Sequence, residues 1–160
     1  AARRGEGDLL VAGGAGSALG GSDNLNAAGG SDAFPKLPEN PADLVATVAK
    51  VARDESTLAT HDVSHGGLAV TLAELLTADA GAEVALDTTV ALFDETPGRV
   101  VVETTDPEGV REAFDGVAAV QSLGDATADG ALSLTVGDET VELGAEAVAE
   151  LRRTIPETLE

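Results

Sequence analysis

Two polar segments of this 160-residue chain carry residue types that suit phosphate and magnesium chemistry. The first, residues 60–70, has the sequence THDVSHGGLAV, and the second, residues 92–102, has the sequence LFDETPGRVVV. In the first, Asp62 precedes Ser64 and the pair Gly66-Gly67, after which apolar residues recur at helical spacing. A helix that starts at glycines has uncovered amide groups at the positive end of its dipole, and these can hold an anion. A neighbouring carboxylate is the protein ligand that Mg²⁺ bound to phosphate prefers.

The same corner also has a purely structural explanation. Glycines between a strand and a helix allow the backbone to turn sharply, whether or not a ligand binds there. Ser64 is predicted to cap a helix over residues 66–77 with its side chain. Asp62 is either a magnesium ligand or a turn residue that hydrogen-bonds to local backbone.

The second segment adds an acidic residue, Glu95, and a basic residue, Arg99, that could take part in the same phosphate and magnesium binding. Glu95 is either a second carboxylate on a facing loop or a solvated charge on an acidic surface. Arg99 is one of only nine basic residues in the chain. Its guanidinium either anchors Glu95 or a phosphate, or pairs with a neighbouring acid as the strand begins.

A zinc site is the competing chemistry for the first segment. His61 and His65 are the only histidines, and two histidines four residues apart on one helix can bind zinc. Here they lie on either side of a strand-to-helix corner, so their rings need not converge. The spacing therefore does not favour a zinc site.

Strands interleaved with helices must position these segments. Strands are predicted over residues 8–12, 57–60, 83–87, 100–104, 118–123, 132–136 and 139–143, the last two joined by a hairpin at Gly137-Asp138. Helices are predicted over 41–54 after a cap at Asn40, over 66–77, from Asp106-Pro107 to Phe114, and over 145–154. This pattern predicts one layered α+β domain over residues 1–160, with an α/β/α arrangement around a mixed sheet.

Residues 13–40 form a glycine-rich segment with no helical or alternating pattern. It is too long for an ordinary connection, so we expect either a binding loop or a flexible surface loop. A dinucleotide fingerprint is absent because Leu19 occupies the place of the third glycine. A Walker loop is absent because Ser22, not lysine, follows Gly21.

Composition restricts the partners and the setting. The formal net charge is −20, from 29 acidic and 9 basic residues, and such self-repulsion is tolerable only where salt screens it. We therefore expect a cytoplasmic protein of a halophile.

Other classes of acidic protein are disfavoured by the sequence. The regular spacing of apolar residues argues against a disordered chain. The sequence contains no EF-hand loop, which argues against a calcium-binding protein. The scarcity of basic residues excludes nucleic acid as a partner. The chain has no apolar run long enough to span a membrane, and it has no cysteine to form a disulfide. The first residue is not Met, which suggests a fragment of a longer polypeptide.

Four motifs together resemble one family. They are HDVSHGGLAVTLAEL, LFDETPGRVVV, the opening GDLLVAGG with the later LGGS, and a terminal helix ending near Ile155-Pro156. In these motifs the chain resembles, over nearly its whole length, the C-terminal domain of the phosphoribosylformylglycinamidine synthases, of the AIR synthase-related (PurM-like) superfamily. Relatives of that fold, such as thiamine monophosphate kinase and the hydrogenase maturation dehydratase, carry different residues at the first motif.

The resemblance implies part of an ATP-dependent C–N ligase of purine biosynthesis. Members phosphorylate the amide oxygen of formylglycinamide ribonucleotide with ATP and Mg²⁺, and ammonia from a glutaminase partner then displaces the phosphate to leave the amidine. Implied partners are the remaining domains of the synthase, the glutaminase and small accessory subunits. The family's principal catalytic histidines lie in the amino-terminal part, so this chain alone is expected to be inactive, and no catalytic residue is assigned. One alternative is a non-catalytic domain that completes a cleft or holds a nucleotide. Another is a related ATP-using member of the superfamily, of the hydrogenase maturation or thiamine monophosphate kinase type.

The resemblance also implies site residues. Asp62 is expected to bind magnesium, and the nucleotide or phosphate is expected at Gly20, Gly21, Ser22, Ser64, Gly66, Gly67, Glu95, Thr96 and Arg99. The chain departs from the family at His65, where an acidic or small polar residue is usual, and at Asp94, where serine is usual. No ligand contact is carried over to those two positions.

Overall fold

Strand β1 (Asp8–Ala12) is buried on both sides, which places it inside a sheet with helices on both faces. The structure is a computed structural model that describes residues 5–14 and 18–157. The other strands are β2 (Thr57–Val63), β3 (Gly81–Leu86), β4 (Arg99–Thr104), β5 (Val120–Thr127), β6 (Ala131–Val136) and β7 (Glu139–Gly144). The helices are α1 (Asp23–Ala28), α2 (Pro41–Val51), α3 (Gly67–Leu75), α4 (Thr89–Phe93), α5 (Pro107–Phe114) and α6 (Ala145–Glu157).

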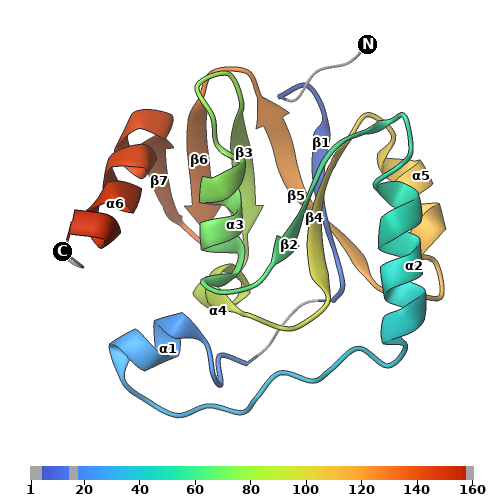
Figure 1. The fold of residues 1–160 in the computed structure, drawn as a ribbon, viewed down its shortest axis with the longest axis horizontal. Helices are drawn as coiled ribbons and strands as arrows, with labels where there is room; N and C mark the ends of the chain where they lie inside the picture. Colours follow the sequence, from blue (N-terminus) through green and yellow to red (C-terminus); the bar gives the residue numbers. More distant parts are fainter. Residues whose placement is uncertain (1–4, 15–17, 158–160) are drawn as a thin grey trace.

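The strands form one mixed sheet in the order β2-β4-β1-β5-β3-β6-β7 (Figure 1). Neighbours are antiparallel except β3 and β6, which pair in parallel. Strand β2 is the edge strand beside β4, with Val63 opposite Arg99. This pairing brings the end of β2 next to the start of β4, so the two polar segments leave the sheet at the same end.

Two apolar cores lie on opposite faces of the sheet, because successive residues of a strand point to opposite sides. One core packs alternate strand residues against helices α3 and α4, and includes Leu9, Val11, Val84, Val101, Leu68, Leu72 and Leu92. The other packs the intervening residues against α2 and α5, and includes Leu10, Ala12, Val100, Val102, Leu44, Val51, Val110 and Phe114. Burial of these side chains stabilises the domain by about 25 cal/mol per Å² of apolar surface removed from water.

The helix layers differ in extent. Helix α6 lies on the α3 side, where Arg152 Nη2 is 3.1 Å from Glu74 Oε1 of α3. The α2 and α5 layer covers the β4 and β1 half of the sheet, whereas Glu83 and Ala85 of β3 are exposed. The predicted α/β/α layering is therefore confirmed, with a second layer that covers one half of the sheet.

All seven predicted strands are present, with ends shifted by a few residues, and the two-residue hairpin at Gly137-Asp138 is confirmed. The predicted cap of α5 is also confirmed, since Asp106 Oδ1 accepts from the Gly109 amide at 3.0 Å. Asn40 precedes α2 but its side chain makes no capping hydrogen bond.

Two short helices escaped prediction. Helix α1 lies within residues 13–40, so the expectation of a segment without helix is wrong for residues 23–28. Helix α4 ends within the second polar segment, at Phe93. Helices of six and five residues are too short to show an apolar period, and each depends on a side-chain cap, from Ser22 and Thr88 respectively.

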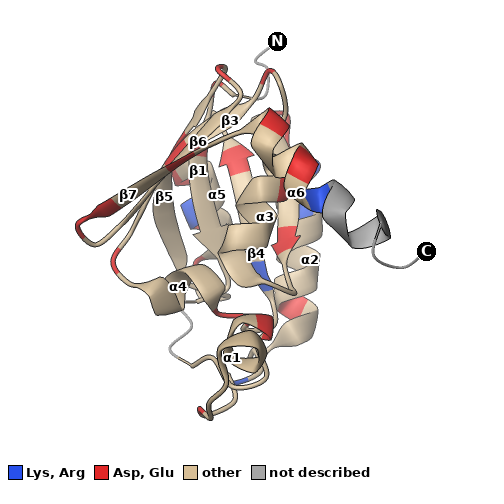
Figure 2. Cartoon of the chain, turned by 90° about the vertical axis from the view of Figure 1, so that its left-hand side faces the viewer, with Lys and Arg blue, Asp and Glu red and all other residues tan. Residues whose placement is uncertain are grey.

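Acidic residues are spread over helices, strands and loops rather than gathered in one patch (Figure 2). Repulsion is therefore distributed over the domain. Within the ranges described, no helix is both long and apolar enough to cross a membrane.

Candidate functional site

The two polar segments meet at one corner of the sheet. The Gly66 amide donates to Glu95 Oε1 at 2.8 Å, across 29 positions of sequence. Gly67 lies against the backbone at the end of α4, where a Cβ would come 2.7 Å from the carbonyl oxygen of Leu92. The expectation that the segments face each other is therefore confirmed.

Helix α3 starts differently from the prediction. Gly66 is its N-cap, in the left-handed conformation with φ +82°, and α3 has no side-chain cap. Ser64 contributes its carbonyl oxygen to the Gly67 amide at 3.0 Å, so the prediction of a Ser64 side-chain cap is wrong. The structural explanation for the glycines is confirmed, since both have a positive φ that other residues rarely adopt.

Gly67→Ala is expected to lower the free energy of unfolding by at least about 2 kcal/mol more than Gly116→Ala. Both glycines have nearly the same φ, +65° and +71°, so the backbone strain is matched. A Cβ at Gly116 meets nothing within 4 Å, whereas at Gly67 it meets the backbone of residues 92–94. Urea unfolding of the two variants measures the difference, and equal losses would show that the close approach at Gly67 is unimportant.

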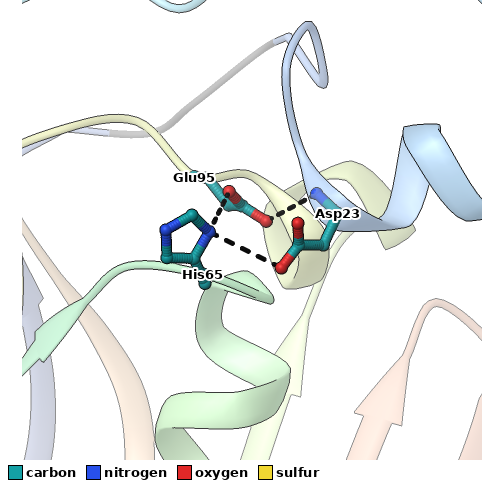
Figure 3. Close-up of side chains that lie close together, drawn as sticks. All are labelled: Asp23, His65 and Glu95. Carbon is teal, nitrogen blue, oxygen red and sulfur yellow. Dashed lines mark hydrogen bonds and ion pairs between the residues drawn. The ribbon is translucent and has the colours of Figure 1, made fainter.

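Glu95 joins three segments of the chain. Its Oε1 accepts from the Asp23 amide at 2.8 Å as well as from Gly66, and only 13% of its side chain is exposed. Figure 3 shows its carboxylate between Asp23 of α1 and His65 of the corner. Glu95 is thus a nearly buried acid that holds the start of α1 against the start of α3.

The predicted Gly20-Gly21-Ser22 loop is ordered beside this corner. Ser22 is 1% exposed, and its hydroxyl accepts from the Leu25 amide at 3.2 Å as the N-cap of α1. The Gly20 amide donates to the Ala33 carbonyl at 3.0 Å, and Leu19 donates to Asp32 Oδ2 at 2.8 Å. Hydrogen bonds from the Leu19 and Ala33 amides lower the pKa of Asp32. This part of the glycine-rich segment thus makes hydrogen bonds within the chain.

Arg99 pairs with Asp94 and not with Glu95, so the expectation that it anchors Glu95 is wrong. Its Nη1 lies 3.0 Å from both the carbonyl oxygen and Oδ2 of Asp94. The two side chains are 2% and 0% exposed. Burial lowers the pKa of the Arg99 guanidinium, and the charge of Asp94 opposes this shift. The other expectation, pairing with a neighbouring acid, is confirmed.

Asp94 also fixes Thr96. Asp94 Oδ1 accepts from the Thr96 amide at 3.1 Å and from its hydroxyl at 2.6 Å. The loop between α4 and β4 is therefore held by a buried acid that sequence reasoning had set aside as a departure from the family.

Asp62 and His61 lie at the end of β2. The Asp62 side chain is 78% exposed, and its Oδ1 is 3.8 Å from His61 Nδ1. His61 Nε2 lies 3.2 Å from Glu74 Oε2 of α3, whereas His65 faces Asp23 and Glu95. The two histidine rings thus point to different partners, as the corner geometry predicts.

One functional candidate was missed by sequence reasoning. Asp23 follows Ser22 directly and reaches the corner through α1, where its Oδ2 is 3.5 Å from His65 Nδ1. The available signal was the Gly-Gly-Ser-Asp sequence, in which Ser followed by Asp is typical of a helix start.

Comparison with known proteins gives a family and a fold. Residues 5–137 match the family described as AIR synthase related protein, C-terminal domain. The chain is 57% identical over its whole length to "Phosphoribosylformylglycinamidine synthase subunit PurL" of Natronomonas pharaonis and 53% identical to that of Haloquadratum walsbyi. It spans 23% of the length of each of these two relatives.

Solved structures share the fold at low identity. A chain of Thermotoga maritima PurL complexed with ATP matches with a TM-score of 0.67 and 17% identity, over 93% of this chain and 26% of that one. The Escherichia coli hydrogenase maturation protein HypE matches with a TM-score of 0.61 and 16% identity, over 88% of this chain and 50% of that one. The family match, which covers most of the chain and includes every segment of the corner, is the deciding observation: the chain belongs to the family of AIR synthase related protein, C-terminal domain.

Proposed function

We propose that this chain is the C-terminal domain of a phosphoribosylformylglycinamidine synthase, the ATP-dependent ligase that converts formylglycinamide ribonucleotide to its amidine. The observation that carries the proposal is the identity of 53–57% over the whole chain to PurL subunits. The fold alone does not distinguish this activity from that of HypE, since both structures match it.

The phosphate group is proposed to bind at the corner, near Gly20, Gly21 and Ser22 before α1 and Ser64, Gly66 and Gly67 before α3. The Gly20, Ser22, Gly66 and Gly67 amides already donate to acceptors within the chain, so phosphate binding at these amides requires those acceptors to be displaced. The Ser22 hydroxyl is buried and caps α1. Thr96 lies on the facing loop, whose shape Arg99 and Asp94 maintain from beneath. With Arg99 buried, we assign it to positioning this loop, while Glu95 positions the two helix starts.

The nucleotide would bind as its magnesium complex. Asp23 and Glu95 lie at the corner and Asp62 lies at the end of β2, and these acids repel a bare polyphosphate. Mg²⁺ neutralises phosphate charge and prefers oxygen ligands with several waters, and the exposed carboxylate of Asp62 fits that donor type. The residues of this chain would bind and orient the phosphates, and other parts of the synthase would supply the catalytic groups.

The implied partners are the remaining domains of the same synthase, a glutaminase that supplies ammonia, and small accessory subunits. A solved structure of PurLQS from Thermotoga maritima contains a chain that shares this fold. The implied setting is the cytoplasm of a halophile.

A second candidate is a structural domain that completes a cleft without binding nucleotide itself. The observation that favours it is that Glu95 already accepts the Gly66 and Asp23 amides, so this part of the corner is satisfied internally. Phosphate at those amides requires the Glu95 carboxylate to move aside.

Calorimetric titration of the chain with ATP and Mg²⁺, in about 2 M KCl to screen its charge, separates the two candidates. The nucleotide-binding proposal expects saturable heat that falls at least about tenfold in affinity in Asp62→Ala. Asp138→Ala, at the exposed hairpin tip, is the matched control and should bind as the parent does. Absence of heat in all three proteins supports the structural domain.

A chimera tests the enzyme assignment itself. The matching segment of the Natronomonas pharaonis subunit is replaced by this chain, and synthase activity is measured with the partner subunits present. We expect activity within about tenfold of the parent and a loss of at least about a hundredfold with Asp62→Ala. A folded chimera without activity would contradict the assignment.

A further inference from the structure

The acids and the imidazole at the corner form a separate cluster from Asp62. Asp23, His65 and Glu95 each offer one ligand atom, and these atoms lie within 4.8 Å of one another. They come from α1, from the turn before α3 and from the loop after α4, and all three side chains point to a common centre (Figure 3). We infer that Asp23, His65 and Glu95 form a binding site for a divalent transition-metal ion that ties these three segments together.

The distances fit one ion. His65 Nδ1 lies 3.5 Å from Asp23 Oδ2 and 3.8 Å from Glu95 Oε2. Two ligands of one metal can be at most about 4.2 Å apart, since each metal–ligand bond is about 2.1 Å. Both separations from His65 are below that limit, and the whole set lies within 4.8 Å. A small rotation of the exposed Asp23 side chain would bring its carboxylate to the ion together with Glu95.

Glu95 is prepared for this role. Its Oε1 is held by two backbone amides, at 2.8 Å each, so the orientation of the carboxylate is fixed and Oε2 faces His65. Its side chain is 13% exposed, whereas Asp23 and His65 are largely exposed and leave the remaining positions of an ion open to water or a ligand. The site thus combines one fixed ligand, Glu95, with two exposed ligands, Asp23 and His65, whose side chains can turn toward the ion.

The negative charge of the cluster also favours binding of a cation. Asp23 and Glu95 bring two negative charges to the corner, and in the part of the chain that the structure describes neither forms an ion pair with lysine or arginine. Neutral imidazole with two carboxylates is a mixed nitrogen and oxygen set, which suits Zn²⁺, Co²⁺ or Mn²⁺ better than Mg²⁺. The inference goes beyond the proposed function because it needs neither nucleotide nor substrate.

Titration of the chain with Co²⁺ alone, in about 2 M KCl to suppress loose binding to the acidic surface, tests the site. We expect one ion per chain and at least about a tenfold loss of affinity in His65→Ala and in Asp23→Ala. His61→Ala removes the only other histidine, which faces Glu74, and should change the affinity by less than about twofold. Circular dichroism confirms that each variant is folded.

The proton resonances of the two histidine rings give a second measurement. Bound Co²⁺ should give the His65 ring protons the largest shifts, through direct ligation, and those of His61 much smaller ones, because only the His65 ring binds the ion. Lack of saturable binding, equal affinity in His65→Ala, or Mg²⁺ binding as tight as Co²⁺ would each overturn the inference. Because nucleotide is absent, failure here leaves the test of the proposed function unaffected.

Discussion

Replacing Asp94 by alanine is expected to lower the free energy of unfolding by about 3–5 kcal/mol. The change leaves the Arg99 guanidinium buried, 2% exposed, without the carboxylate that neutralises it. It also removes the acceptor for the Thr96 amide and hydroxyl, so the loop after α4 loses its fixed shape. Chemical denaturation at constant salt measures the loss.

Asp62→Ala is the matched control, because it removes an acid of the same type that is 78% exposed. Its effect on stability should stay within about 0.5 kcal/mol. The double variant Asp94→Ala with Arg99→Leu should recover part of the loss, since a buried pair replaced by apolar groups is often tolerated. A loss below about 1 kcal/mol in Asp94→Ala alone would mean that the pair is solvated.

Salt should control whether the domain is folded. With a net charge of −20 on 160 residues, we expect the melting temperature to be lower by at least about 10 °C in 0.05 M than in 2 M KCl. The Debye length shortens from more than about 10 Å to a few ångströms over that range, so repulsion between exposed acids largely disappears. Thermal unfolding followed by circular dichroism at a series of KCl concentrations measures the shift.

An uncharged osmolyte distinguishes the screening of charge by salt from the general stabilisation that any solute excluded from the protein surface provides. Sucrose also favours compact states, but it does not screen charge, so it should raise the melting temperature much less than KCl. Glu139→Gln with Glu142→Gln removes two exposed acids of the edge strand β7 and should weaken the salt dependence. A melting temperature that is unchanged in millimolar salt would contradict the role assigned to the charge.

The relatives agree with this view of the charge. Natronomonas pharaonis and Haloquadratum walsbyi are halophilic archaea, and their PurL subunits are more than half identical to this chain. The acidic composition had already predicted a halophile before the relatives were considered.

The strands and the longer helices were predictable because their signals are local. In β1, Leu9 and Val11 face one core and Leu10 and Ala12 the other, and this apolar run is visible in the sequence. Pro107 after Asp106 marks the start of α5 in the same way. The motifs around Asp62 and Glu95 were likewise sufficient to predict a corner and to suggest the family.

The contacts inside the corner could not be predicted, because they join positions far apart in the chain. Glu95 meets Asp23 across 72 positions, and this contact depends on α1, a helix too short to be recognised by its period. The sequence allows either Asp94 or Glu95 to pair with Arg99, and in the structure Asp94 forms the ion pair.

The sequence by itself determined the acidic character, the strand and helix pattern and the presence of a glycine-flanked corner, since each depends on residue type and near-neighbour spacing. Only the tertiary structure decided that Asp94 is the buried partner of Arg99, that Gly66 rather than Ser64 is the N-cap of α3, and that Glu95 accepts hydrogen bonds from the starts of two helices. The physical reason is that ion pairs and hydrogen bonds act over a few ångströms, and the order of strands in the sheet decides which residues come that close.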